Sequence, residues 1–287
     1  MGIFYPPSPL KSQILSNNVY NTYNYLAKLQ NIIIDCPEDE IILDFFSCPF
    51  SHAIFTAFIG SLSVWAIRFR KNITYRVKRD SPLSNYFKRS GLYSFITGDT
   101  VDYTNGNTIP FRKVDMDDSE IIDYIDNILK LAPVKLSGNA EEILFKNIYE
   151  IFINSVDHAN ANNGVYACGH WMPKMKELVF SVYDTGIGIP ERIKTQINRD
   201  YTSKDALEWA LIKGNSTKQL DDGTPRGVGL SDLKNFIYLN KGAFNIVSND
   251  IYYSYNQENT YIYLDRPIIG TMISFIIRND EEHIYIA

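Results

Sequence analysis

Residues 178–190 read LVFSVYDTGIGIP, an alternating apolar segment that ends in an aspartate and a glycine-rich turn. Leu178, Phe180 and Val182 fall on one side of an extended chain, which predicts a strand with that side in a core. The segment Val165–Met172 just upstream is also strand-like, and a short turn separates it from the first. Together the two segments predict a β-hairpin.

The turn after this strand is a candidate ligand site. Asp184 stands at the end of the strand, and Gly186 and Gly188 would let the backbone approach a flat ligand closely. A carboxylate in this position can accept a hydrogen bond from an exocyclic amine. A plain connection from strand to helix would also account for the same residues.

Length and composition limit the possible classes of protein. The chain has 287 residues, enough for about two domains of roughly 150 residues. Apolar residues make up 45% and charged residues 21%, which excludes a disordered or fibrous architecture. The net charge of -5 is a poor electrostatic match for nucleic acid. The cysteines (Cys36, Cys48 and Cys168) are odd in number and lack metal-ligand spacing, which indicates reduced thiols in a cytoplasmic protein.

No membrane partner is expected either. The first residues lack a basic segment followed by an apolar one, so no secretory signal is predicted. The most apolar stretch, Ala53–Ile67, is shorter than the about 20 residues that cross a bilayer. A helix packed against a sheet accounts for this stretch.

The first half of the chain alternates strand-like and helix-like segments, which predicts an α/β domain. Its expected strands are Ile32–Ile34, Ile41–Phe46 and Asn72–Val77, and its expected helices are Ser51–Arg70, capped by Ser51, and Pro82–Ser90. The chain is thus divided into an N-terminal arm (1–24), a small α/β domain (25–97), a polar linker (98–118) and a second domain (119–287).

The second half combines amphipathic helices with strands. Helices are expected over Ser119–Leu131, from Ser137 or Asn139 to about Ala159, over 191–213 and over Leu230–Leu239. Besides the hairpin, four strands are expected over Phe244–Val247, Ile251–Tyr255, Thr260–Leu264 and Thr271–Ile277.

The helix 140–159 carries an unusual polar stripe. Glu150, Asn154, Asp157 and His158 lie at positions i, i+4, i+7 and i+8, so they share one face of an otherwise largely apolar helix. Buried polar groups are costly unless they are paired. A magnesium ion and a water would pair them, with the Asn154 oxygen as a hard ligand and Glu150 as a base. A stripe satisfied within the protein is the alternative.

A glycine-rich segment follows the helical region 191–213. Its first part, GNSTK at 214–218, offers hydroxyl and ammonium donors from Ser216, Thr217 and Lys218. Its second part, GTPRGVGL at 223–230, opens a helix, and the N-terminus of a helix binds anions. The segment matches neither the P-loop nor the dinucleotide fingerprint. A surface loop is the alternative.

Taken in order, these motifs resemble the ATP-binding domain of the gyrase, heat-shock chaperone, histidine kinase and mismatch-repair (GHKL) superfamily. The resemblance covers about residues 115–279, more than half of the chain. The matching residues are Glu150 and Asn154; Asp184, Gly186 and Gly188; Arg226, Gly227, Gly229 and Leu230; and Gly270 and Thr271. It implies a two-layer α/β sandwich, in which a mixed sheet is covered by helices on one face and ATP lies between them under a mobile lid.

The same resemblance implies a role for each motif. Asp184 would read adenine, Asn154 would hold Mg²⁺, residues 214–229 would cap the phosphates, and Glu150 would activate water. The full set of ATP-binding residues implied is Asn154, Asp157, His158, Asp184, Gly186, Gly188, Ser216, Thr217, Lys218, Arg226, Gly227, Val228, Gly229, Leu230 and Thr271. Serine kinases of the anti-sigma-factor type also carry this glutamate, so it leaves hydrolysis and phosphotransfer both open.

Residues 25–97 more weakly resemble a STAS-type domain, as in anti-sigma-factor antagonists. The cues are the strand end Ile42–Phe45, a following helix, a strand at Ile73 and the pair Gly91-Leu92. The acceptor serine of that family aligns with His52 and Ala53, so phosphorylation on the antagonist pattern is not supported. A generic α/β domain that mediates contacts is the alternative.

The leading hypothesis is a cytoplasmic, Mg²⁺-dependent ATPase that acts as a regulatory switch in signalling, through a protein partner or a second copy of the chain. A serine/threonine protein kinase acting on a partner is the first alternative. A non-enzymatic ATP sensor is the second. A histidine kinase is disfavoured, because only His52 lies outside the ATPase half and near the start of a helix.

Overall fold

The computed structural model describes residues 2–5, 18–49, 51, 53–101, 106–115, 117–131, 139–159, 164–219, 225–226, 229–256 and 258–278. Of residues 18–21, 157–159, 218–219 and 225–226 only the backbone is described. Within these ranges the protein is a mixed α/β structure that contains a parallel three-stranded sheet and an antiparallel five-stranded sheet. No helix of the described chain has the length and apolar character that a bilayer crossing requires.

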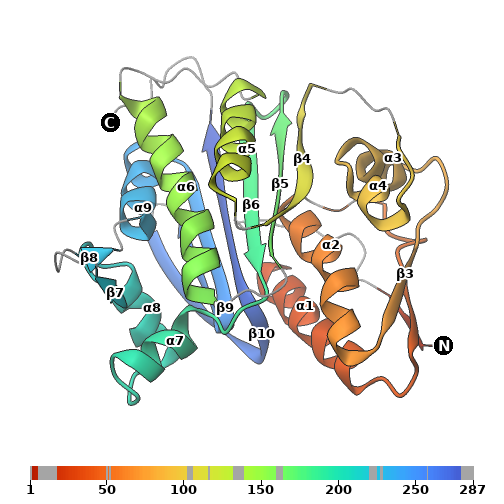
Figure 1. Cartoon of the computed structure of the whole chain (residues 1–287), viewed down its shortest axis with the longest axis horizontal. Helices are drawn as coiled ribbons and strands as arrows, with labels where there is room; N and C mark the ends of the chain where they lie inside the picture. The colour runs from red at the N-terminus through yellow and green to blue at the C-terminus, as the bar shows by residue number, and fades with distance from the viewer. Residues whose placement is uncertain are drawn as a thin grey trace.

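The five-stranded sheet is the centre of the molecule (Figure 1). In spatial order its strands are β4 (Thr108–Val114), β5 (Val165–Met172), β6 (Glu177–Asp184), β10 (Glu258–Arg278) and β9 (Ala243–Asn256). Every neighbouring pair is antiparallel, and the predicted hairpin of β5 and β6 is confirmed. Thr271 of β10 lies opposite Asp184 of β6, so the two predicted motifs meet at one end of the sheet.

One face of this sheet is covered by three helices, α5 (Asp118–Leu131), α6 (Ala140–Ala159) and α9 (Gly229–Leu239). The side chains predicted to share a face, Leu178, Phe180 and Val182, are all buried in this layer. Two shorter helices, α7 (Ile189–Gln196) and α8 (Ser203–Ala210), lie beside one end of α6 (Figure 1).

The opposite face is covered as well, which the expected two-layer arrangement does not include. Helices α1 (Asn18–Asp35) and α2 (Ile54–Ala66) pack on it and share one apolar core with the sheet. The physical reason lies in β6, all eight residues of which are buried. Val179 and Tyr183 point away from α6 and contribute to the core beneath α1 and α2, so a second helical layer is needed to bury them.

The parallel sheet contains β1 (Gly2–Phe4), β2 (Glu40–Asp44) and β3 (Asn72–Arg76) in that order. The strands expected at Ile41–Phe46 and Asn72–Val77 are therefore confirmed. A 3-10 turn (Ile67–Phe69) follows α2, and helices α3 (Pro82–Arg89) and α4 (Leu92–Thr97) follow β3. Gly91 between these helices has φ +76, the left-handed conformation that ends a helix.

Two expectations in the first half are wrong. Ile32–Ile34 forms no strand but the end of α1, because Leu26, Leu29 and Ile33 repeat at helical spacing and are all buried. A three-residue apolar run alone cannot distinguish a buried strand from a helix. Ser51 does not cap α2, since the cap position is Ala53 and no side chain caps the helix.

Three expectations in the second half also differ from the structure. The segment 98–118, expected to be a linker, contains β4, whose residues pair with β5 at the edge of the sheet. The helical stretch 191–213 is two helices, because Thr202 and Asp205 form a capping box that starts α8. The four C-terminal strands join into two long ones, β9 and β10.

Candidate functional site

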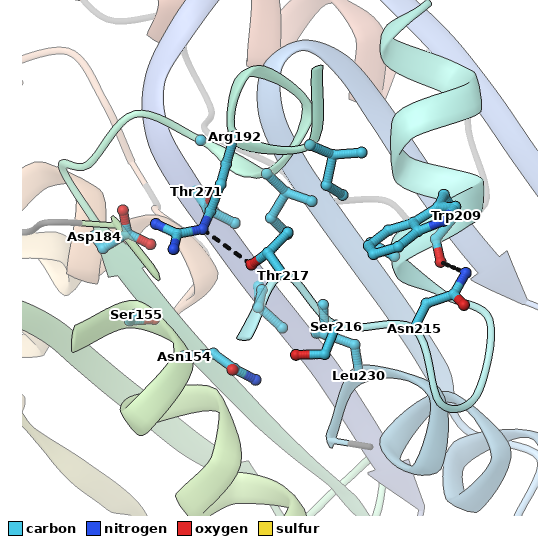
Figure 2. A pocket seen from close by; sticks show the side chains of 15 residues that line it. Asn154, Ser155, Asp184, Arg192, Trp209, Asn215, Ser216, Thr217, Leu230 and Thr271 are labelled. Atoms are coloured by element: carbon cyan, nitrogen blue, oxygen red, sulfur yellow. Dashed lines mark hydrogen bonds between the residues drawn. The ribbon is translucent and has the colours of Figure 1, made fainter. Parts of the chain in front are cut away.

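A pocket opens between α6, the ends of β6 and β10, and the segment 188–217. Figure 2 shows polar side chains from these elements pointing toward a shared space. The residues that line it are Asn154, Ser155, Asp184, Gly188, Ile189, Arg192, Ile193, Trp209, Ala210, Asn215, Ser216, Thr217, Leu230, Thr271 and Ile273. Its mixture of apolar walls with a few polar groups is typical of small-molecule sites.

Asp184 is the buried acid of this pocket, and only 3% of its surface is exposed. Burial raises the pKa of its carboxyl group to about 7, although hydrogen bonds from the backbone N–H groups of Gly186 and Thr271 oppose the rise. The Gly186 N–H donates to Oδ1 of Asp184 at 2.8 Å. A desolvated carboxylate of this kind gains from any further hydrogen-bond donor that a ligand brings.

The backbone packs tightly around Asp184. Gly270 has φ +87, and a β-carbon at this position would overlap the carbonyl oxygen of Asp184. The Thr271 hydroxyl contacts the Ser248 hydroxyl at 2.8 Å, which ties β10 to β9 at the same level. The hydroxyl of Thr185 is buried and has no hydrogen-bond partner among the described residues. Glycine is therefore required at 270, both for its backbone conformation and for space.

Residues of strand β9 also form hydrogen bonds with the loop that precedes α7 and with the start of that helix. The Ile189 N–H donates to the Ser248 hydroxyl at 2.9 Å, and the Glu191 N–H donates to Oδ1 of Asn249 at 3.2 Å. The Asn249 side-chain amide returns a hydrogen bond to the Ile187 carbonyl at 2.9 Å. Gly188 has φ +87, and any side chain there would collide with Asn249. The second glycine of the predicted turn is thus explained by close packing.

Helix α6 supplies the opposite wall. Asn154 lines the pocket, whereas Glu150, one turn earlier and half-buried, lies beside it. A β-carbon built on Gly229 would come within 2.5 Å of Cβ of Glu150 and 3.6 Å of Nδ2 of Asn154. The N-terminus of α9 therefore lies directly against this turn of α6. It places the positive end of a helix dipole beside a carboxylate and a carboxamide.

The outer wall is made by the segment that follows α7. Nε of Arg192 donates to the Thr217 hydroxyl at 3.1 Å, and Nδ2 of Asn215 donates to the Trp209 carbonyl at 2.9 Å, as the dashed lines in Figure 2 show. Arg192, Trp209 and Asn215 were not among the residues that the sequence singled out. Arg192 follows Gly188 by one helical turn, and this spacing is the one signal that could have identified it.

The structure brings together many of the predicted site residues. Those that line the pocket are Asn154, Asp184, Gly188, Ser216, Thr217, Leu230 and Thr271. Gly186 contacts Asp184, and Gly229 lies against Glu150. Gly227 and Val228, and the side chains of Asp157, His158, Lys218 and Arg226, lie outside the described residues.

Comparison with family models and with curated proteins identifies no family for this chain. No protein-family model matches the chain, and no curated protein matches it. Within the part of the chain that the structure describes, no group of three or more His, Cys, Asp or Glu side chains could hold a metal ion.

Proposed function

We propose that this protein binds ATP together with Mg²⁺ in the pocket and hydrolyses it as a nucleotide-dependent switch. One observation carries the proposal: a single cavity contains Asp184 on one wall and, on another, Asn154 beside the N-terminus of α9. These groups match the two unlike ends of a nucleotide, an aminated base and a polyanion.

The base would lie at the Asp184 end. The exocyclic amine of adenine donates a hydrogen bond, which an ionised Asp184 accepts in a site with little competing water. Ile189, Ile193 and Ile273 line the pocket and supply apolar contacts for a flat ring. A guanine base presents a carbonyl where adenine presents this amine, and Asp184 would disfavour it.

The phosphates would lie at the Asn154 end. Backbone N–H groups in the first turn of α9 and the hydroxyls of Ser216 and Thr217 are donors for phosphate oxygens. The Asn154 carbonyl oxygen is a hard ligand of the type that Mg²⁺ accepts, and Mg²⁺ in proteins commonly has one or two protein ligands besides phosphates and water. When bound, the ion would neutralise charge that develops on the phosphates.

Glu150 would act as the base. It lies one turn from Asn154 on the same face of α6 and is half-buried. In this step, a water oxygen bonds to the γ-phosphorus, the bond from phosphorus to the β–γ bridging oxygen breaks, and Glu150 takes the proton of the water. The products are ADP and inorganic phosphate.

The test is incubation of the pure protein with Mg²⁺ and γ-labelled ATP, with free phosphate and labelled protein followed together. We expect free phosphate, and we expect its release to be lost in Asn154→Ala. Label that moves to protein instead would support the serine/threonine kinase alternative. ATP binding without either product would support the alternative of a non-enzymatic ATP sensor. Absence of ATP binding would refute the proposal.

A further inference from the structure

Gln30 of α1 lies on the face of the sheet opposite the pocket and is fully buried. Its Nε2 donates to the Tyr183 hydroxyl at 2.8 Å, and its Oε1 accepts from the Ile269 N–H at 2.8 Å. The Tyr183 hydroxyl in turn donates to the Ile269 carbonyl. These three residues form a closed ring of hydrogen bonds in which each group has a fixed role. The backbone N–H of Ile269 can only donate, which fixes the orientation of the Gln30 amide.

This ring joins the two strands directly beneath the acidic end of the pocket. Tyr183 immediately precedes Asp184 on β6, and Ile269 immediately precedes Gly270 and Thr271 on β10. Gly270 packs against the Asp184 carbonyl. A shift of the Ile269 peptide would therefore be passed to Asp184 through one residue on each strand.

Strand β10 needs this support because its ladder is broken here. Its pairing with β9 shifts register between Tyr263 and Ile268 and again between Ile268 and Thr271, and its pairing with β6 begins only at Thr271. The Ile269 peptide is thus bonded to Gln30 and Tyr183. A second residue of α1, Asn24, accepts from the Asp265 N–H at 2.7 Å in the same irregular segment.

We propose that Gln30 is a positioning residue for the base end of the pocket, so that α1 sets the nucleotide affinity of a site that it does not line. This inference rests on the proposed function. It adds that the first helix of the chain is part of the construction of the nucleotide site. It also means that a displacement of α1 changes affinity without any contact to the ligand.

The test uses Gln30→Met, which keeps the approximate volume and removes both hydrogen bonds. Titration calorimetry with Mg²⁺ and ATP is expected to show about tenfold weaker binding. The matched control is Thr56→Val on α2, which loses a buried hydrogen bond of 2.9 Å to the Tyr86 hydroxyl in the same helical layer. We expect the control to lose comparable thermal stability and to keep the affinity of the wild type.

A second variant and a second readout keep the proposal testable. Tyr183→Phe removes the hydroxyl that bonds to Gln30 and to the Ile269 carbonyl. Its effect on ATP affinity should not add to that of Gln30→Met. In nucleotide-free protein, carbon-detected NMR titration of the carboxyl groups should show a lower pKa for Asp184 in Gln30→Met, because a loosened backbone admits water. This readout remains if the wild type fails to bind ATP, which would refute the proposed function separately. Unchanged affinity and unchanged Asp184 titration in both variants would overturn the positioning role.

Discussion

The two faces of the five-stranded sheet are built from the same strands but are used differently. On the face covered by α1 and α2, aromatic rings fill the space, as where Tyr23 stacks on Tyr252 with ring centroids 5.0 Å apart. On the face covered by α6, the side chains leave an open pocket. Gln30 and Tyr183 on the closed face bond to each other, whereas Asp184 and Asn154 line the pocket on the open face. One face therefore stabilises the sheet, and the other provides a candidate ligand site.

The comparison predicts the largest loss of stability on the closed face. Phe55 is fully buried there and packs edge-on against Tyr23, with centroids 5.7 Å apart. Phe55→Ala should lower the free energy of unfolding by about 3–5 kcal/mol, because the cavity that it leaves has nothing to fill it. Ile189→Ala, at the half-buried edge of the pocket, should cost only about 1 kcal/mol. Urea unfolding of both variants measures the contrast, and equal losses would contradict it.

A second prediction concerns chemistry on the open face. Glu150→Gln should retain the affinity for ATP, because Glu150 does not line the pocket. The rate of phosphate release should fall by about 10²–10⁴-fold, the usual contribution of a general base. Single-turnover kinetics with labelled ATP separates the two quantities. An unchanged rate would remove Glu150 from the mechanism while leaving the binding site in place.

The third prediction concerns Gly270, which packs against the Asp184 carbonyl. Gly270 and Gly214 have nearly the same φ, +87 and +88, but different surroundings. An alanine side chain at 270 would overlap the Asp184 carbonyl, whereas at 214 it would meet no atom of the described residues within 4 Å. Gly270→Ala should therefore cost about 3 kcal/mol or more, and Gly214→Ala only about 1 kcal/mol. Similar losses in denaturant unfolding would show that backbone conformation alone sets the cost.

Much of the open face could be predicted from the sequence. The alternation of Leu178, Phe180 and Val182 identified the buried side of β6, and the spacing of Glu150 and Asn154 placed both on one face of α6. These patterns are local and periodic, so a single sequence carries them. The proximity of Asp184 and Thr271 depends on the register of two strands that are far apart in the chain. In the sequence, only the order of the motifs suggested that these residues lie together.

The closed face could not be predicted in the same way. Helix α1 buries Tyr23, Asn24 and Gln30 among its leucines, and these polar side chains obscure the helical spacing of its apolar residues. The structural role of Gln30 depends on the interruption in the pairing of β10 with β9 near Ile269. No local sequence pattern marks that interruption. Arg192 and Trp209 were missed because the region 191–213 is two short helices whose relative placement depends on tertiary packing.

The pH dependence of ATP binding follows from the raised pKa of Asp184, about 7 in the folded protein. Between about pH 4 and pH 7 the native protein holds a proton that the unfolded chain has lost, so stability falls as pH rises through this window. The carboxylate that we propose accepts the adenine amine is half formed at about pH 7 and predominates above it. Affinity should therefore increase with pH up to that point and level off above it.

The most direct test of the central claim is calorimetric titration with Mg²⁺ and ATP at pH 8 and pH 6, on the wild type and on Asp184→Asn. The account predicts wild-type binding at pH 8 that weakens by about tenfold at pH 6. In Asp184→Asn, binding should be weak at both pH values and should show no such dependence. Wild-type protein that fails to bind ATP at pH 8, or a variant that binds as tightly as the wild type, would contradict the account.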